Sequence, residues 1–163
     1  MKRVALSAAA LVTAGAVSVA VFALVRFDDS GARCFSQDGD LAIAACTQAI
    51  QSGRFSGMEL ASIYDNRAIE LRQQGEFDRA IDDYSAAIRI DAELTGAYTG
   101  RGLAWEGKAD ADKAKADYRK ALTLAQKYED GQWAHETARG RLQALGELGA
   151  STSSRTMAAG VVD

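Results

Sequence analysis

The amino-acid sequence predicts an all-α fold, more narrowly a short right-handed α-solenoid of helix-turn-helix repeats with a C-terminal capping helix and an N-terminal membrane or signal segment. Composition supports the first part, because the 163 residues include no proline and only 7% aromatic side chains, which favours helices over a β-sandwich. With 48% hydrophobic and 25% charged residues, the chain resembles one globular domain with tails. A 34-residue repeat with apolar positions at helical spacing supports the second part.

The first 26 residues form a separate segment that is excluded from the globular fold. Lys2 and Arg3 precede 22 uncharged residues, Val4 to Val25, enough for a helix to span a hydrocarbon core of roughly 30 Å. Two interpretations stay open, an uncleaved signal anchor and a signal peptide cleaved after the small residues at 18–20; a buried core helix is a weaker third. The first two place the domain at a bacterial inner membrane facing the periplasm or, after cleavage, free in the periplasm.

The exported part of the chain is acidic. Without Lys2, Arg3 and Arg26 it retains 16 basic and all 22 acidic side chains, a net charge of −6. Binding to a phosphate backbone needs clustered lysine and arginine. We therefore expect no nucleic-acid partner, and contact with a membrane only through the N-terminal segment.

The two cysteines, Cys34 and Cys46, both lie in the exported part. Thiol pairs tend to close in an oxidising compartment, so an even count favours one disulfide. The alternative is that Cys46 is a small buried residue and Cys34 a free thiol. Their spacing fits neither a C-x-x-C motif nor a cysteine-histidine cluster, so no metal site is expected.

An internal repeat is the most informative feature of the sequence. Residues 61–94 align without a gap on residues 95–128. Seven positions are identical between the two segments: Tyr64 and Tyr98, Arg67 and Arg101, Asp78 and Asp112, Ala80 and Ala114, Asp83 and Asp117, Tyr84 and Tyr118, and Ala87 and Ala121.

This pattern resembles the tetratricopeptide repeat family, whose 34-residue motif is W-x2-L-G-x2-Y, then A-x3-F, then P. The motif positions in the first repeat are occupied by Tyr64, Ala68, Leu71, Ala80 and Tyr84, and in the second by Tyr98, Gly102, Trp105, Ala114 and Tyr118. The sequence departs from the motif at the closing proline, replaced by Ala92 and Gln126, and at the leucine, replaced by Arg67 and Arg101. The resemblance implies a helical solenoid that binds proteins or peptides.

The register of the repeat divides the chain into a linker at 27–37, a repeat domain at 38–149 and a disordered tail at 150–163. Within the domain we expect a half repeat at 38–56, in which Cys46 takes an aromatic position, full repeats at 61–94 and 95–128, and a capping helix at about 131–147. The expected helices are 38–52, 57–74, 77–91, 94–108, 111–127 and 131–147.

The capping helix is expected to bury one apolar stripe, formed by Trp133, Ala134, Ala138, Leu142, Leu145 and Leu148. Arg139 and Arg141 would face elsewhere, as the outer face of a terminal helix requires.

In both repeats an aspartate follows an arginine by 16 residues, Arg67 to Asp83 and Arg101 to Asp117. This separation brings the first and second helices of one repeat together. The sequence therefore predicts two structural ion pairs inside the repeats.

No catalytic or cofactor-binding pattern is apparent, so we expect no enzyme activity and no cofactor. The only histidine, His135, lies in the expected capping helix and is interpreted as a surface residue. Gly96, Gly100 and Gly102 fall inside a helical pattern without a preceding strand, and are interpreted as close-packing positions instead of a phosphate loop.

The resemblance places the first helix of each repeat on a concave face that receives a peptide or a partner helix. The candidate binding residues there are Asp65, Asn66, Ile69, Arg72, Thr99, Leu103 and Glu106. Asn66 matches a position at which some family members hold a peptide carboxylate, but Gly96 and Gly100 replace the basic partners of that clamp. We expect an envelope-located interaction or adaptor module; the alternative is a structural homo-oligomer of the cell envelope without a separate ligand.

Overall fold

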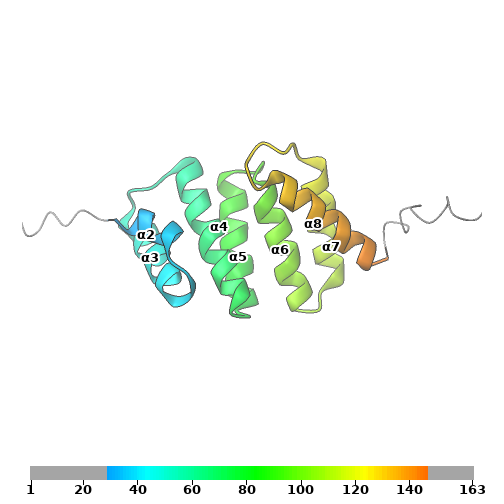
Figure 1. The fold of residues 1–163 in the computed structure, drawn as a ribbon, viewed down its shortest axis with the longest axis horizontal. Coiled ribbons are helices and arrows are strands. Elements are labelled where there is room, and N and C mark those ends of the chain that lie inside the picture. Colours follow the sequence, from blue (N-terminus) through cyan, green and yellow to red (C-terminus); the bar gives the residue numbers. More distant parts are fainter. Residues whose placement is uncertain (1–28, 147–163) are drawn as a thin grey trace, which may run out of the picture.

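The computed structural model describes residues 29–146, which form an all-α repeat fold (Figure 1). Its helices are α2 (Ser30–Ser36), α3 (Gly39–Ser52), α4 (Gly57–Gln73), α5 (Phe77–Ile90), α6 (Thr95–Gly107), α7 (Ala111–Thr123) and α8 (Gly131–Ala144). In this part of the chain no helix is both long and apolar enough to cross a bilayer. The segments expected as a signal sequence at 1–26 and a tail at 150–163 lie outside the described residues.

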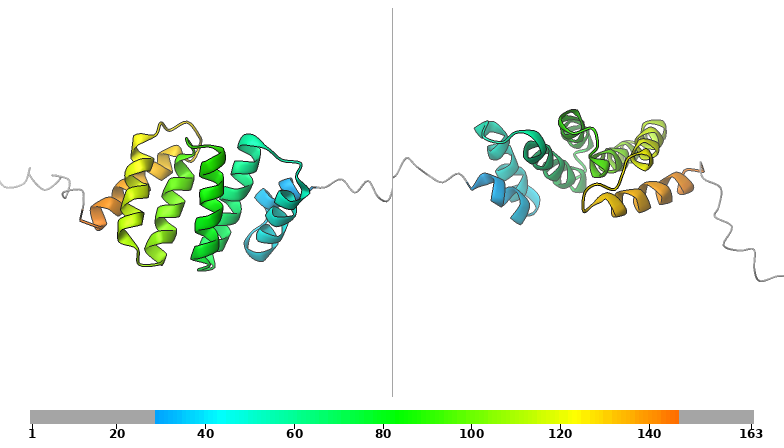
Figure 2. Two further views of the ribbon diagram at one scale, coloured as in Figure 1. Left: turned by 180° about the vertical axis from the view of Figure 1, so that it is seen from behind. Right: turned by 90° about the horizontal axis from the view of Figure 1, so that it is seen from above.

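Successive helices pack side by side in a single curved array, α4 against α5 and α6 against α7 (Figure 1). Seen from above, α2 and α8 project on the same side of this array, one at each end (Figure 2). The side between them is called the concave face below.

Helices α3 to α6 begin and end within one residue of the expected ranges. The main differences lie at the two ends of the array. The segment 27–37 is not only a linker, because Ser30–Ser36 form the helix α2, and α7 ends at Thr123 instead of residue 127.

Contacts with neighbouring helices explain why a segment as short as α2 is helical. Isolated helices of this length are unstable in water, but Cys34 is fully buried and joined to Cys46 of α3 by a disulfide with an S–S distance of 2.09 Å. The Nδ2 atom of Asn66 in α4 donates a hydrogen bond to the Cys34 carbonyl at 2.6 Å. The disulfide and the Asn66 contact thus attach α2 to α3 and α4.

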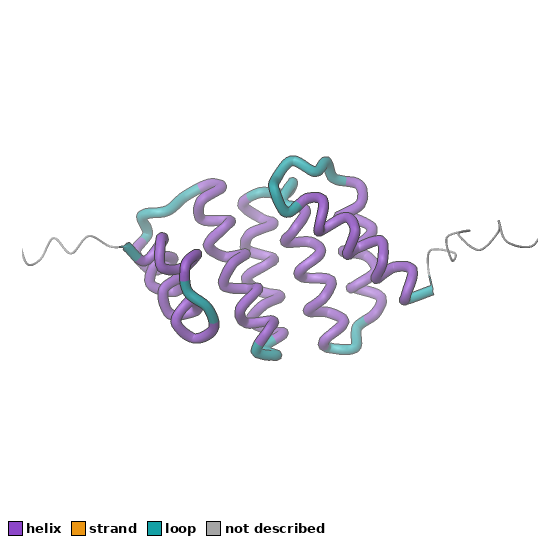
Figure 3. Tube along the Cα trace, viewed as in Figure 1, coloured by secondary structure: helices purple, strands orange, loops and turns teal. Residues whose placement is uncertain are grey.

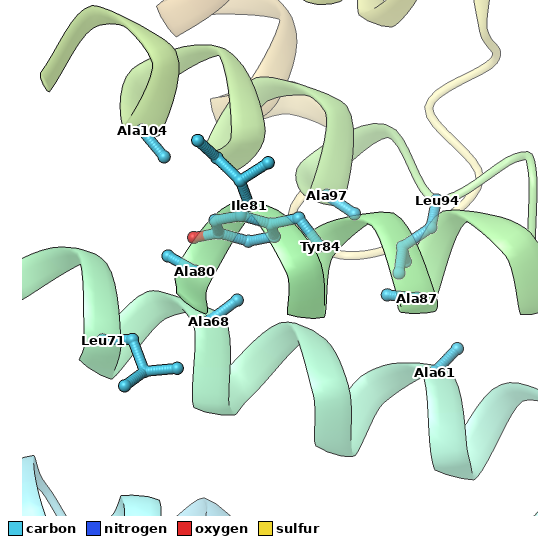
Figure 4. Close-up of a cluster of buried hydrophobic side chains, with 10 residues drawn as sticks. All are labelled: Ala61, Ala68, Leu71, Ala80, Ile81, Tyr84, Ala87, Leu94, Ala97 and Ala104. Carbon is cyan, nitrogen blue, oxygen red and sulfur yellow. The ribbon is translucent and has the colours of Figure 1, made fainter. Parts of the chain in front are cut away.

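Alanines pack with the ring of Tyr84 and with Leu71, Ile81 and Leu94 in a core cluster of α4, α5 and α6 (Figure 4). Tyr84 of α5 and Tyr118 of α7 are almost completely buried. A Cβ atom at Gly100 would lie 2.4 Å from the Tyr84 ring, and one at Gly102 would lie 2.6 Å from the Tyr118 ring. These two glycines of α6 are therefore close-packing positions.

The two ion pairs expected from the repeat are present and bidentate. Arg67 contacts Asp83 at 2.6 and 2.8 Å, and Arg101 contacts Asp117 at 2.8 and 2.7 Å. Each aspartate is buried, and the hydrogen bonds to it raise the pKa of the arginine above its ordinary value. Such planar two-point contacts combine charge with fixed geometry.

Each of these arginines also reaches the preceding repeat. The Nη1 atom of Arg67 donates a hydrogen bond to Thr47 of α3 at 2.9 Å, and the Nη1 atom of Arg101 donates one to Ser85 of α5 at 3.0 Å. One arginine side chain therefore joins three successive helices. The sequence period predicts the aspartate partner but not this second contact.

The connection from α7 to α8, residues 124–130, runs back over the turn between α5 and α6 (Figure 3). Three contacts hold it on that turn: Tyr128 Oη donates to Asp91 at 2.6 Å, Lys127 Nζ donates to Glu93 at 2.6 Å, and Thr95 Oγ1 donates to the Ala125 carbonyl at 3.2 Å. Residues expected to extend α7 thus contact the preceding repeat, and α8 begins on the concave side, where it packs against both α6 and α7.

The first prediction concerns the ion pair between α6 and α7. In a double-mutant cycle, Arg101→Ala and Asp117→Ala should show a coupling free energy of about 2 kcal/mol or more, because each change leaves a largely buried charge without its partner. The exposed pair Arg79–Glu76 is the matched control and should couple by less than about 1 kcal/mol. Urea unfolding of the four variants in each cycle measures both values, and equal coupling in the two cycles would contradict the prediction.

The second prediction concerns the disulfide. Replacing Cys34 and Cys46 together by alanine should lower the free energy of unfolding by about 3 kcal/mol, the value expected for closing a loop of this length. Amide hydrogen exchange should accelerate more in α2 than in α6 and α7, which make no contact with it. Unchanged exchange in α2 would show that the disulfide is not needed to hold that helix.

Candidate binding cleft

A cleft of about 740 Å³ opens on the concave face, between α4 and the start of α8. Its walls come from α2, α4, α5, α6, α8 and the residues just before α6 and α8. The lining residues are Phe35, Met58, Ser62, Asp65, Asn66, Ile69, Arg72, Tyr84, Leu94, Gly96, Gly100, Tyr128, Glu129, Asp130 and Trp133.

Four of the seven candidate binding residues lie in this cleft: Asp65, Asn66, Ile69 and Arg72. All four belong to α4. Asp65 and Asn66 are adjacent, and Ile69 and Arg72 follow at spacings of three to four residues, which places all four on one side of that helix; Ser62 extends the same row by one turn. The first repeat therefore supplies the concave-face residues expected from the sequence.

The other three candidates, Thr99, Leu103 and Glu106, do not line the cleft, because α8 packs over their side of α6. Thr99 is fully buried and donates a hydrogen bond to the Ala134 carbonyl of α8 at 3.2 Å. Leu103 is partly buried in a cluster with residues of α7 and α8. The structure therefore places none of these three residues in the cleft.

Two side chains of the described structure contact Glu106. It accepts hydrogen bonds from Arg141 of α8 and from the hydroxyl of Tyr118, and these contacts lower the pKa of its carboxyl. Arg141 therefore faces α6, contrary to the expectation that it points away from the array. The second repeat uses its concave side to hold the capping helix.

The glycines of α6 explain why the cleft is open between α4 and α8. Gly96 and Gly100 stand 34 residues after Ser62 and Asn66, so they are the second-repeat equivalents of two α4 cleft residues. A Cβ atom at Gly96 would lie 1.7 Å from the Asp130 carboxylate. The bare backbone of α6 thus gives Asp130 access to the cleft.

The main residues that sequence reasoning missed are Phe35, Met58, Tyr84, Asp130 and Trp133. Trp133 is the clearest case, because it was assigned to a buried stripe and its side chain is instead 49% exposed in the cleft. Trp133 stands one residue before Ala134 and five before Ala138, so it lies beside the buried row of Ala134, Ala138 and Leu142 and not on it. Whether Trp133 lines the cleft depends on the direction of α8, and that direction depends on tertiary contacts of the loop before it.

Asn66 has a structural contact of its own. Its amide donates to the Cys34 carbonyl and lies 3.8 Å from both sulfur atoms of the disulfide. This amide therefore connects α4 to α2 at one edge of the cleft, instead of being free to hold a peptide carboxylate.

Three polar atoms in the cleft wall are buried and have no hydrogen-bond partner: Asp65 Oδ1, Arg72 Nε and Tyr84 Oη. Buried polar atoms without partners are uncommon and costly. Burial, together with the negative charge of Asp130, raises the pKa of Asp65 to about 7. Burial also raises the pKa of Asp130 and, with the charge of Asp65, that of Tyr84.

Within residues 29–146 no group of three or more histidine, cysteine, aspartate or glutamate side chains could hold a metal ion. The imidazole of His135 is partly buried, with Nδ1 3.0 Å from Gln126 Nε2.

The fold and the cleft define the class of protein: a short helical-repeat protein with a ligand-sized cleft on its concave face. Two family models match the sequence, one described as TPR repeat over residues 69–107 and one as tetratricopeptide repeat over residues 95–128. Among solved structures the chain is similar to the "Arabidopsis OM64 TPR domain", with 30% sequence identity, coverage of 62% of this chain and 80% of that one, and a TM-score of 0.50. A comparison with curated proteins finds no match.

The chain belongs to the tetratricopeptide repeat family. Proteins of this family generally mediate protein-protein interactions and are generally not enzymes.

The third prediction tests the buried carboxylate. The folded-state pKa of Asp65 is raised from 3.8 to about 7, so its favourable contribution is complete below its unfolded pKa and is lost as pH rises through the folded pKa. Asp65→Asn, which mimics the protonated acid, should therefore have a higher free energy of unfolding than wild type at about pH 8, by up to about 4 kcal/mol. Near pH 4 the two free energies of unfolding should be similar.

The matched control is Asp82→Asn, an exposed aspartate on α5. Urea unfolding at both pH values should give no comparable pH-dependent change for this variant. If Asp65→Asn differs from wild type by the same amount at both pH values, the Asp65 carboxyl does not have a raised pKa.

Proposed function

We propose that this protein is an interaction module that binds an extended segment of a partner protein in the cleft between α4 and α8. One observation carries the proposal. Of the five large apolar side chains that are exposed in residues 29–146, three line this cleft: Phe35 at 53%, Met58 at 40% and Trp133 at 49%. Exposed apolar groups gathered at a concave site, beside a few polar groups, are typical of binding sites.

The size and position of the cleft favour a short extended segment as the ligand. A volume of about 740 Å³ lies within the range of roughly 300 to 1,000 Å³ that is usual for ligand pockets. A whole partner helix along α6 would overlap α8, which already contacts Thr99 and Glu106. The segment would instead follow α4, with Ile69 and Trp133 on its two sides.

The proposal places this module in a bacterial cell envelope. The uncharged run from Val4 to Val25 supports export as a signal anchor or a signal peptide. The disulfide between Cys34 and Cys46 is of the kind that persists in an oxidising compartment such as the periplasm. The domain would then bind its partner outside the cytoplasm.

A selection from a random peptide library on the full-length chain tests the binding function. Peptides recovered on wild type should bind Trp133→Ala at least about tenfold more weakly, because buried aromatic anchors dominate such interfaces. Leu41→Ala is the matched control, since Leu41 is 66% exposed and lies outside the cleft, and it should leave the affinity unchanged.

Two results would contradict the proposal. The selection could recover no binding peptide, which would contradict the binding function. Alternatively, the Trp133 and Leu41 variants could lose equal affinity for the recovered peptides, which would place binding outside the cleft. If light scattering instead shows a permanent oligomer that Trp133→Ala dissociates, the exposed apolar residues serve self-association, and the homo-oligomer expected as the alternative is the better account.

A further inference from the structure

The charges around the cleft are unequal. Its lining includes three carboxylates, Asp65, Glu129 and Asp130, and a single positive group, Arg72. The carboxylates of Asp65 and Asp130 come from α4 and from the residue preceding α8, and they are near enough for the charge of Asp130 to act on Asp65. None of the salt bridges found among residues 29–146 involves either carboxylate, which favours a positively charged ligand.

Polar atoms at the Asp65 end of the cleft also lack hydrogen-bond partners. Tyr84 is 1% exposed, its hydroxyl has no hydrogen-bond partner, and it lines the cleft beneath the bare backbone of Gly100. The Oδ1 atom of Asp65 is likewise buried without a partner. A buried acceptor that lacks a donor is costly when the site is empty, so a ligand that supplies the donor would recover this loss.

We propose that Asp65, Asp130 and Trp133 form a subsite for a basic side chain, lysine or arginine, of the bound segment. This inference rests on the proposed function, and it specifies the chemistry of the partner. An ammonium or guanidinium group would donate charge-assisted hydrogen bonds to the two carboxylates. The exposed indole of Trp133 would contact the same group through its ring face or cover its aliphatic part.

The composition of the other walls agrees with a cation at this position. The wall formed by α6 contributes the glycines 96 and 100, and the wall formed by α2 contributes Phe35, so neither adds a charge. Arg72 lies two helical turns from Asp65 along α4, and its guanidinium acts on the hydroxyl of Tyr84. An acidic ligand at the Asp65 end would meet two carboxylates, which argues against recognition of a peptide carboxylate there.

A direct titration tests the subsite without knowledge of the partner. The probes are Nα-acetyl-lysine amide and Nα-acetyl-norleucine amide, which have the same backbone and differ in the terminal ammonium. Proton-nitrogen NMR spectra of the full-length chain follow the indole signal of Trp133, assigned with Trp133→Phe. We expect the lysine probe to bind at least about fivefold more tightly than the norleucine probe, as a cation facing a carboxylate and an aromatic ring should.

Variants assign the effect to the carboxylates. The double substitution Asp65→Asn with Asp130→Asn should abolish the preference for the lysine probe, whereas Asp82→Asn, which removes an exposed charge from α5, should preserve it. The preference should also weaken below about pH 7, where Asp65 takes up a proton, because a neutral carboxyl attracts a cation less. Of the other charged groups in the cleft, Asp130 opposes this ionisation, and the phenol of Tyr84 lies close enough for the charge of Asp65 to act on it.

Equal binding of the two probes, or a lysine preference that survives the double substitution, would overturn the subsite. Peptides selected from the library through Trp133 would in that case still support the binding function, so the two proposals can fail separately. A fixed acidic residue in those peptides, in place of a basic one, would assign recognition to Arg72 and would also reject the inference.

Discussion

The attachment of the α7–α8 connection to the turn between α5 and α6 determines the shape of the cleft on the concave face. Tyr128 contacts Asp91, and Lys127 contacts Glu93, so the chain after α7 is directed back toward the concave face. The position of α8 follows from this, and so do the contacts of Arg141 with Glu106 and of Thr99 with the α8 backbone. The terminal helix therefore covers the concave side of the second repeat and forms one wall of a cleft on the first.

This arrangement leaves polar groups of the cleft without hydrogen-bond partners. Asp65 Oδ1 and the Tyr84 hydroxyl are buried, the latter against Gly100 of α6, and the charge of Asp130, the residue before α8, repels Asp65. Polar groups in a folded core are normally paired, and departures from that rule concentrate at functional sites. The unpaired groups and the exposed indole of Trp133 lie in one cavity, which makes this the part of the described structure best suited to a ligand.

The sequence predicted the interior of the repeat array well because the repeat fixes which residues meet. Arg67 and Asp83 are brought together by the same 16-residue separation as Arg101 and Asp117, and Gly102 is small because a tyrosine ring packs on it. The two ends of the array follow no period. Helix α2 depends on a disulfide and on Asn66, and α8 depends on contacts of a non-repeating loop. The repeat period therefore could not predict Phe35 or Trp133 as cleft residues. It also could not predict that α8 covers the side of α6 that carries Thr99 and Glu106.

The most direct test of this account is a crystal structure of the full-length chain bound to a peptide selected from the library. The account predicts an extended peptide between α4 and α8, in contact with Ile69 and Trp133, while α8 keeps its contacts with Thr99 and Glu106. A peptide bound on the side of α5 and α7, or one that takes the place of α8 on α6, would contradict the claim that the terminal helix forms the binding site.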